Sequence, residues 1–347
     1  MRKPHVLFVT EKWCDCNPER GLTNSFHNLF GSLECSGLAT YENLFFDEYT
    51  IEKKIKVDKD FIEKGIQADL VVVTPLNGIH HAPGIRSYKH IKKPIVAIHF
   101  DSVSPKNLAY ADLLIPYITC NVVLDSGKSY LNSLYDEKYL PLWTPQDPRI
   151  FYNPNKGRDI NLSFLGTMIG RKDREDGINF LGARELPVYQ MGGQREKFLT
   201  IEEYADVLQR SVITLNFSFN SQWHQLKGRI FEALLCGACL VESKNDEITK
   251  YFSEGEHFYG FRHTEELRDV IRGLIFDRKA VDKVAKQGQE RCETLFNGTK
   301  WWEAVFERVR CSYPDFYVEA GKPDFQHQGH FQPRIECADN NSIIRQS

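Results

Sequence analysis

Short apolar runs alternate with amphipathic stretches along the whole chain. Runs whose apolar residues are continuous occur at 5–10, 42–46, 69–74, 94–100 and 121–125, and the pattern restarts after Pro154 at 160–166, 187–191, 212–217 and 238–242. Between these runs lie helical stretches of about ten to fifteen residues, the length of crossovers between parallel strands. Continuous apolar strands indicate sheets that are buried on both faces. The pattern therefore predicts an α/β chain with two Rossmann-like domains.

A connection between the two domains is expected where the apolar pattern lapses. The stretch "TPQDPRIFYNPNKGRD" at 144–159 holds three prolines and few apolar residues, a composition that favours a linker. Helical patterns follow at 264–276, 279–296 and 299–313, and the chain beyond Pro314 is polar and aperiodic. In chain order we expect a first domain at 1–148, a linker at 149–158, a second domain at 159–298, a helix that crosses back to the first domain at 299–313, and a polar tail at 314–347.

Composition and charge narrow the class of protein. The 347 residues suffice for two domains, and a net charge of −3 gives no basic field that would attract nucleic acid or an anionic membrane. No window approaches the ~20 apolar residues of a transmembrane helix, and the N-terminal residues lack the long apolar region of a secretory signal. We expect a cytoplasmic protein without a transmembrane segment.

The stretch "KGRIFEALLCGACLVES" at 227–243 carries the clearest candidate chemistry. A helix is predicted to begin near Lys227, after the strand at 212–217. Ligands of open α/β sheets bind at the carboxyl ends of strands, where helix N-termini present free N–H groups. Cations are unfavourable at the positive end of the helix dipole, so Lys227 and Arg229 indicate an anionic partner. Gly228 would let the backbone approach that anion.

Glu232 lies on the flank of the apolar stripe of the same predicted helix. Its carboxylate could accept hydrogen bonds from both hydroxyls of a ribose whose phosphates lie at the helix start. The alternative is an intrahelical pair between Arg229 and Glu232 at spacing i, i+3, which contributes only a few tenths of a kcal/mol. The residues alone leave both interpretations open.

Several stretches of the second half resemble a known family. They are "KGRIFEALLCGACLVES", "YFSEGEHFYGF" (251–261), "EELRDVIRGLI" (265–275), "LSFLGTMIGRKDRE" (162–175) and "FLTIEEYADVLQRSVITLNF" (198–217). Together they resemble the C-terminal half of GT-B glycosyltransferases, and within these the group 1-like branch that includes CgeB-type spore maturation proteins. The resemblance covers roughly residues 158–310; the first half is similar only in its alternation of strands and helices.

The resemblance implies two Rossmann-like domains that face a central cleft, and a metal-independent, retaining transfer of a sugar from a nucleotide-diphosphate donor to an acceptor hydroxyl. It implies these site residues: Arg171, Lys227, Gly228 and Arg229 for the diphosphate, Glu232 for the ribose, and Met191 and Gly192 near the base. Eight residues before the ribose-binding position the family has a second glutamate, which contacts the donor sugar. This chain has His224 there, so the identity of the sugar stays open.

Candidate catalytic residues of the first half follow predicted strands. Glu11 follows the strand at 5–10, His81 lies in the segment after 69–74, and Asp101 follows 94–100. Carboxyl ends of parallel strands share one edge of the sheet, where such a side chain could deprotonate an acceptor hydroxyl. The alternative for each is a capping or loop role.

No metal or cofactor is expected. The pair Cys236 and Cys239 ends a predicted helix, whereas redox pairs of this spacing begin one, so a structural role is favoured. The acceptor could be a glycan, a lipid carrier, a protein or a small molecule. Two rival functions stay open: a nucleotide-sugar epimerase or hydrolase on the same scaffold, and an inactive protein that binds a nucleotide sugar.

Overall fold

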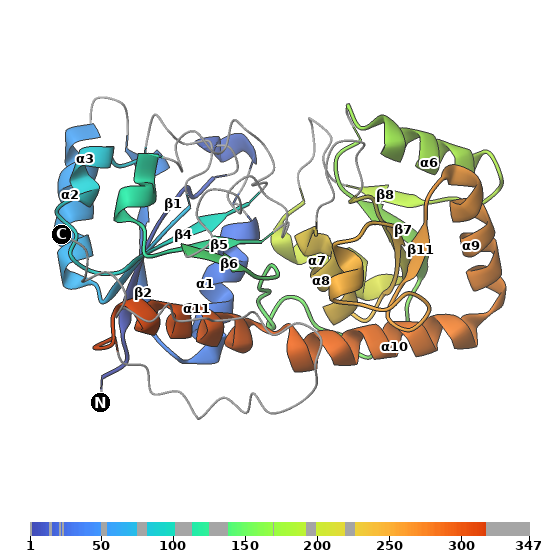
Figure 1. The fold of residues 1–347 in the computed structure, drawn as a ribbon. Helices are drawn as coiled ribbons and strands as arrows, with labels where there is room; N and C mark the ends of the chain where they lie inside the picture. The colour runs from blue at the N-terminus through green and yellow to red at the C-terminus, as the bar shows by residue number, and fades with distance from the viewer. Residues whose placement is uncertain are drawn as a thin grey trace, which may run out of the picture. The chain divides into compact units, whose positions relative to one another are not determined.

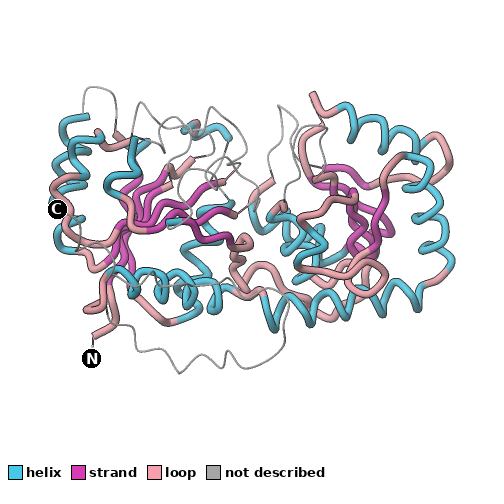
Figure 2. The backbone as a smooth tube through the Cα atoms, in the orientation of Figure 1, coloured by secondary structure: helices cyan, strands magenta, loops and turns pink. Residues whose placement is uncertain are grey.

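The computed structural model describes residues 2–13, 16–20, 22, 24–49, 54–74, 82–100, 113–124, 138–168, 170–191, 199–218 and 226–316. The chain forms two compact units. The first comprises Met1–Thr10, Leu38–Leu142 and Trp302–Ser347, and the second comprises Glu11–Gly37 and Trp143–Trp301. Figure 1 labels their helices and strands, and Figure 2 colours the same trace by secondary structure.

The first unit is built on a six-stranded sheet with order β2-β1-β3-β4-β5-β6, in which all the pairs are parallel. The continuous apolar runs become the strands because both faces of the sheet are covered. Their bounds are β1 His5–Thr10, β2 Thr40–Phe45, β3 Leu70–Val73, β4 Ile95–His99, β5 Cys120–Val123 and β6 Tyr139–Pro141.

Helices of the first unit pack on this sheet through amphipathic faces. They are α2 Lys54–Gln67, α3 Ile85–Tyr88 and the part of α11 Gly298–Ser312 that follows Trp301. Trp302 is fully buried and its ring meets the edge of Phe8 at a centroid distance of 5.7 Å. Because the division falls within α11, this helix begins in the second unit and ends in the first.

The second unit is built on a five-stranded parallel sheet with order β11-β10-β9-β7-β8. Its strands are β7 Ile160–Leu165, β8 Tyr189–Met191, β9 Ser211–Asn216, β10 Cys239–Ser243 and β11 Tyr259–Phe261. Its helices are α1 Asn24–Ser36, α6 Lys172–Gly182, α7 Ile201–Arg210, α8 Gly228–Leu235, α9 Thr264–Phe276, α10 Arg278–Leu295 and the start of α11. Helices α6 and α9 lie side by side, and α10 packs against α8 (Figure 1).

Polar contacts, one buried and one exposed, join α1 to the rest of the second unit. Asn28 donates to Gln146 Oε1 at 2.6 Å, and Arg149 forms an ion pair with Glu34 at 2.7 Å. Asp147 is buried and accepts from Arg149. Burial raises the pKa of the Asp147 carboxyl, but its hydrogen bonds with His27 and then with Arg149 lower the pKa by more, so that it lies below its ordinary value. Gln146, Asp147 and Arg149, at the start of the proline-rich stretch 144–159, thus hold α1.

The elements predicted from the sequence agree closely with those observed, and the α/β class with two parallel-sheet, Rossmann-like units is confirmed. The pattern missed β6 and β11, which have three residues each. Runs of that length are too short to give a periodic signal. Cys236 and Cys239, for which a structural role was favoured, are buried and form no disulfide. None of the described helices is long and apolar enough to cross a membrane.

A buried histidine makes stability depend on pH. His99 ends β4, and its Nε2 lies 2.9 Å from Asn121 Oδ1. Burial lowers the pKa of His99 to about 4 from 6.5. Below pH 6.5 the unfolded chain therefore takes up a proton that the folded chain excludes. The free energy of unfolding should fall by about 2 kcal/mol between pH 6.5 and 5, at ~1.4 kcal/mol per pH unit.

Urea unfolding of His99→Gln at both pH values checks this prediction. The glutamine amide still reaches Asn121 but does not titrate. The fall in the free energy of unfolding between pH 6.5 and 5 should therefore be smaller in this variant. The exposed His90, replaced by Gln, is the matched control and should leave the slope in place. An unchanged slope in His99→Gln would assign the acid sensitivity to other groups.

Candidate functional site

The sheet of the second unit has a topological switch point between β7 and β9. From β7 the chain goes outward to β8 on one side and returns to β9 on the other. Ligands of open α/β sheets bind outside the carboxyl ends of the strands at this point. Phe164 of β7 is in register with Leu215 of β9, so Gly166 and Asn216 mark the two strand ends side by side.

Helix α8 begins near these strand ends. Lys227 is its N-cap, with extended backbone (φ −86°, ψ 143°), and its side chain does not cap the helix. The first N–H groups are therefore not satisfied by an N-cap side chain. Gly228 follows, and a Cβ on it would lie 3.2 Å from Thr144 Cγ2. The close approach of Thr144 therefore accounts for a glycine at position 228, and no bound ligand is needed to explain it.

Arg229 projects its guanidinium to the carboxyl end of the sheet. Its Nη1 donates to Asn216 Oδ1 at 2.8 Å, and its Cζ lies 5.7 Å from the centre of the Phe164 ring. Gly166 has a φ of +149°, and a Cβ there would lie only 2.8 Å from Nη2 of the arginine. Within the described residues, the buried Nε has no hydrogen-bond partner. The guanidinium is held in place with donor capacity left over.

Two further arginines lie near Arg229. Arg174 is buried and donates to Thr167 O at 2.9 Å and to Phe217 O at 3.3 Å, so it joins the segments that follow β7 and β9. Burial, and then the charges of Arg229 and Arg171, lower its pKa to about 10. Arg171 is exposed at the N-cap of α6. Because these cations repel one another, an anion at this edge would be strongly favoured.

Glu232 lies one turn after Arg229 and takes its hydrogen bond from another helix. The hydroxyl of Tyr204, on α7, donates to Glu232 Oε2 at 2.7 Å. Burial raises the pKa of Glu232, whereas the Tyr204 hydrogen bond and the Arg229 charge lower it. Arg229 bonds Asn216 and Glu232 bonds Tyr204, so the intrahelical pair is not their main contact. Within the described part of the chain, no hydrogen bond is seen to the other carboxylate oxygen, Oε1, which can accept from a ligand.

The backbone of β8 also reaches the switch point. The Gly166 N–H donates to Met191 O at 3.0 Å, which places the end of β8 beside the loop that packs on Arg229. The structure therefore brings together Arg171, Arg229, Glu232 and the Met191 backbone. Gly192 and His224, predicted near the base and the sugar, lie outside the described residues.

Of the candidate catalytic residues, only Glu11 is described. It follows β1, is buried, and accepts from Cys16 Sγ at 3.2 Å. Its segment belongs to the second unit. His81 and Asp101 lie outside the described residues, so their predicted role stays a prediction.

Sequence reasoning missed four residues of this edge. Gly166 and Arg174 stand inside the stretch "LSFLGTMIGRKDRE", and Tyr204 and Asn216 stand inside "FLTIEEYADVLQRSVITLNF". A polar residue at the end of an apolar strand was the available signal for Asn216. The others gave none, because their role depends on which strands become neighbours.

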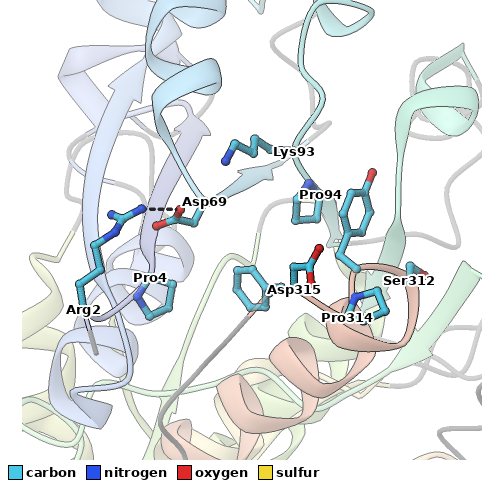
Figure 3. Close-up of a pocket in the computed structure, with 10 residues that line it drawn as sticks. Arg2, Pro4, Asp69, Lys93, Pro94, Ser312, Pro314 and Asp315 are labelled. Carbon is cyan, nitrogen blue, oxygen red and sulfur yellow. Dashed lines mark hydrogen bonds and ion pairs between the residues drawn. The ribbon is translucent and has the colours of Figure 1, made fainter.

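The first unit has a pocket of its own, with a volume of about 400 Å³ (Figure 3). Pro4, Asp69 and Pro94, which line it, directly precede β1, β3 and β4. The pocket therefore lies at the amino ends of the strands, opposite to the edge predicted for an acceptor. Arg2 pairs with Asp69 there at 2.8 Å. In the part of the chain that the structure describes, no group of three or more His, Cys, Asp or Glu side chains is arranged to hold a metal ion.

Comparison with known proteins agrees with the fold of two parallel-sheet units. Residues 164–307 match the model of the family described as "Glycosyl transferase-like". No curated protein sequence matches the chain. Among solved structures, HepE (Alr3699) of Anabaena in complex with UDP-glucose is 12% identical with a TM-score of 0.62, and the match covers 88% of this chain and 99% of that one.

Two other structures have comparable similarity. Sucrose-phosphate synthase from Thermosynechococcus elongatus is 13% identical with a TM-score of 0.62, and the match covers 89% of this chain and all of that one. An alpha-glucosyltransferase in complex with UDP and a 13-mer DNA is 10% identical with a TM-score of 0.63, covering 88% and 100%. The chain therefore has the GT-B fold, and its residues 164–307 match the model of the glycosyl transferase-like family.

Proposed function

We propose that the protein is a glycosyltransferase that moves a sugar from a nucleotide-diphosphate donor to an acceptor hydroxyl. One observation carries the proposal: the Arg229 guanidinium is fixed at the β7–β9 switch point with a buried Nε that has no partner among the described residues. Arg174 and Arg171 add positive charge there. Three guanidinium groups at the edge where α/β sheets bind ligands fit a diphosphate.

In the proposed reaction the bond between the sugar C1 and the diphosphate oxygen breaks, the acceptor oxygen bonds to C1, and the acceptor hydroxyl gives up its proton to a base, for which Glu11, His81 and Asp101 are the candidates. Negative charge grows on the leaving diphosphate, and Arg229, Lys227 and Arg171 stabilise it, an electrostatic contribution that is commonly the largest in catalysis. The first N–H groups of α8, at the positive end of the helix dipole, also stabilise the negative charge on the diphosphate. Glu232, oriented by Tyr204, accepts hydrogen bonds from the ribose hydroxyls.

Finer features of the proposal follow from the resemblance of the sequence. We place the chain in the group 1-like branch with the CgeB-type proteins, and we propose a retaining, metal-independent reaction. UDP-sugars are the first donors to examine, since HepE was solved with UDP-glucose. Glu11, His81 and Asp101 are the candidates for contact with the acceptor hydroxyl.

A thermal-shift experiment tests the donor site. The purified protein is heated with UDP, GDP, ADP, CMP or dTDP, in magnesium and in EDTA. A ligand at 100 times its Kd stabilises the folded state by about 2.7 kcal/mol, so one nucleotide should raise Tm selectively and equally in both media. In Glu232→Ala the donor affinity should fall by about tenfold, because a charge-assisted hydrogen bond contributes roughly 1.5–3 kcal/mol. At the same ligand concentration the stabilisation, and with it the Tm shift, should then fall to about half, roughly 1.4 kcal/mol.

The same experiments include a control variant and distinguish the two alternative functions. Glu203→Ala, on the capping box of α7, removes a carboxylate from the second unit outside this edge and should leave nucleotide affinity unchanged. No shift with any nucleotide would overturn the donor site. Donor turnover without an acceptor would identify an epimerase or hydrolase, and binding without turnover for any acceptor would identify an inactive binding protein.

A further inference from the structure

A charged residue lies inside the sheet of the second unit, next to the proposed donor site. Glu242, in β10, is completely buried. Its Oε2 accepts from Asn216 Nδ2 at 2.5 Å, and its Oε1 accepts from Ser218 N and Ser243 Oγ, both at 3.0 Å. Burial raises the pKa of Glu242, although these hydrogen bonds lower it. Each of the three donors is neutral, so the carboxylate bears much of its desolvation cost.

Asn216 connects this carboxylate to Arg229. Asn216 and Glu242 are register partners on the adjacent parallel strands β9 and β10, so their side chains lie on the same face. The amide Nδ2 faces Glu242, and Oδ1 accepts from Arg229 Nη1 at 2.8 Å. A carboxylate only accepts and a guanidinium only donates, so chemistry fixes this orientation of the amide. The three side chains form one carboxylate–amide–guanidinium chain.

We infer that Glu242 is a positioning residue that acts through Asn216 to hold Arg229 in the orientation that binds the donor diphosphate. The inference rests on the proposed role of Arg229. The carboxylate polarises the amide and strengthens its hydrogen bond to Nη1, since bonded polar groups in a low-dielectric site reinforce one another. With Nη1 thus engaged, the Nε–H, which has no partner among the described residues, keeps the guanidinium able to donate to a ligand.

The negative charge of Glu242 also stabilises the arginine cluster when no nucleotide sugar is bound. It offsets the repulsion within the arginine cluster, and its effect on the pKa of Arg174 opposes that of Arg229. Asn216, Ser218 and Ser243 occupy the carboxylate oxygens. The negative charge is therefore turned away from an incoming phosphate and does not compete with it.

The alternative is that Glu242 only fastens the end of β9, through the Ser218 N–H. In that case Glu242→Gln would lower stability, and any effect on ligand binding would be the same for ligands with and without phosphates. A positioning role predicts a loss that is specific to the diphosphate and that requires Arg229. A double-mutant cycle separates the two.

The experiment measures Kd for UDP and for uridine by calorimetry or competition. The variants are Glu242→Gln and Asn216→Ala, each alone and combined with Arg229→Ala. Each single substitution should weaken UDP binding by about five- to twentyfold, because a charge-assisted network contact is removed, and leave uridine binding within twofold. Combined with Arg229→Ala, neither should weaken UDP binding further. Asn216→Ala tests the chain independently if Glu242→Gln does not fold.

Ser243→Ala is the matched control. It removes one hydrogen bond to the same carboxylate but leaves Asn216 and Arg229 in place, so UDP affinity should change little. A full, additive loss from Glu242→Gln in the Arg229→Ala background would overturn the positioning role alone. Equal UDP binding by the wild type and Arg229→Ala would instead remove the proposed diphosphate site, and the inference with it.

Discussion

Replacing Arg229 with alanine should lower kcat/KM for the nucleotide-sugar donor by about 10²–10³, the cost of removing one preorganised donor to a developing negative charge, or roughly 3–4 kcal/mol. The guanidinium is held by Asn216 and packs near Phe164, so it does not need to reorganise when charge develops. Loss of the cation also leaves Glu232 and Glu242 without its compensating charge. Steady-state kinetics with the nucleotide sugar selected by thermal shift measure the effect.

A lysine at position 229 separates the effect of the positive charge from that of the guanidinium geometry. Arg229→Lys keeps the charge but loses the planar fork that binds Asn216 and a phosphate together, so its activity should fall between the wild type and alanine. Arg210→Ala is the matched control. Arg210 is partly exposed and pairs with Asp159, and the two residues directly precede β9 and β7, at the amino ends of the strands and away from the proposed site. An Arg229→Ala enzyme with wild-type kcat/KM would remove this residue from the reaction.

Replacing Gly166 with alanine should impair the same guanidinium without touching it chemically. The new Cβ would lie 2.8 Å from Nη2 and 3.1 Å from Cζ of Arg229, so the flexible arginine must move. A displacement of about 1 Å can cost up to 10²-fold in activity, and we expect UDP affinity and kcat/KM to fall by about ten- to a hundredfold. The φ of +149° adds backbone strain, with a cost of roughly 1–3 kcal/mol in stability.

Gly255→Ala provides the matched control for that strain. Gly255 also has a positive φ, +78°, and a Cβ there would meet nothing within 4 Å. Its Tm should fall in a similar way while UDP affinity stays unchanged. Calorimetric Kd values for UDP and the Tm of the two variants test this prediction. Equal UDP affinities in Gly166→Ala and Gly255→Ala would show that Gly166 is needed only for its backbone conformation and that Arg229 tolerates the added methyl group.

The sequence by itself determined the secondary structure and the chemistry of one helix start. Continuous apolar runs identified nine of the eleven strands in the described chain, because both faces of each sheet are buried. Lys227 and Arg229 were recognised because cations oppose the helix dipole at that place. The predicted helix start and the observed one agree within one residue. These are local properties, and local spacing suffices to predict them.

Only the tertiary structure decided which residues surround that helix start. Gly166, Asn216 and Glu242 come from three different strands, and they meet because β9 lies between β7 and β10. Spacing along the chain gives no information about strand order. Glu242 lies in the apolar run at 238–242, and its bond to Asn216 depends on the β9–β10 register. The hydrogen-bond partner of Glu232 is likewise Tyr204 on α7. This partner could not be predicted from spacing, because it depends on which helix packs against α8.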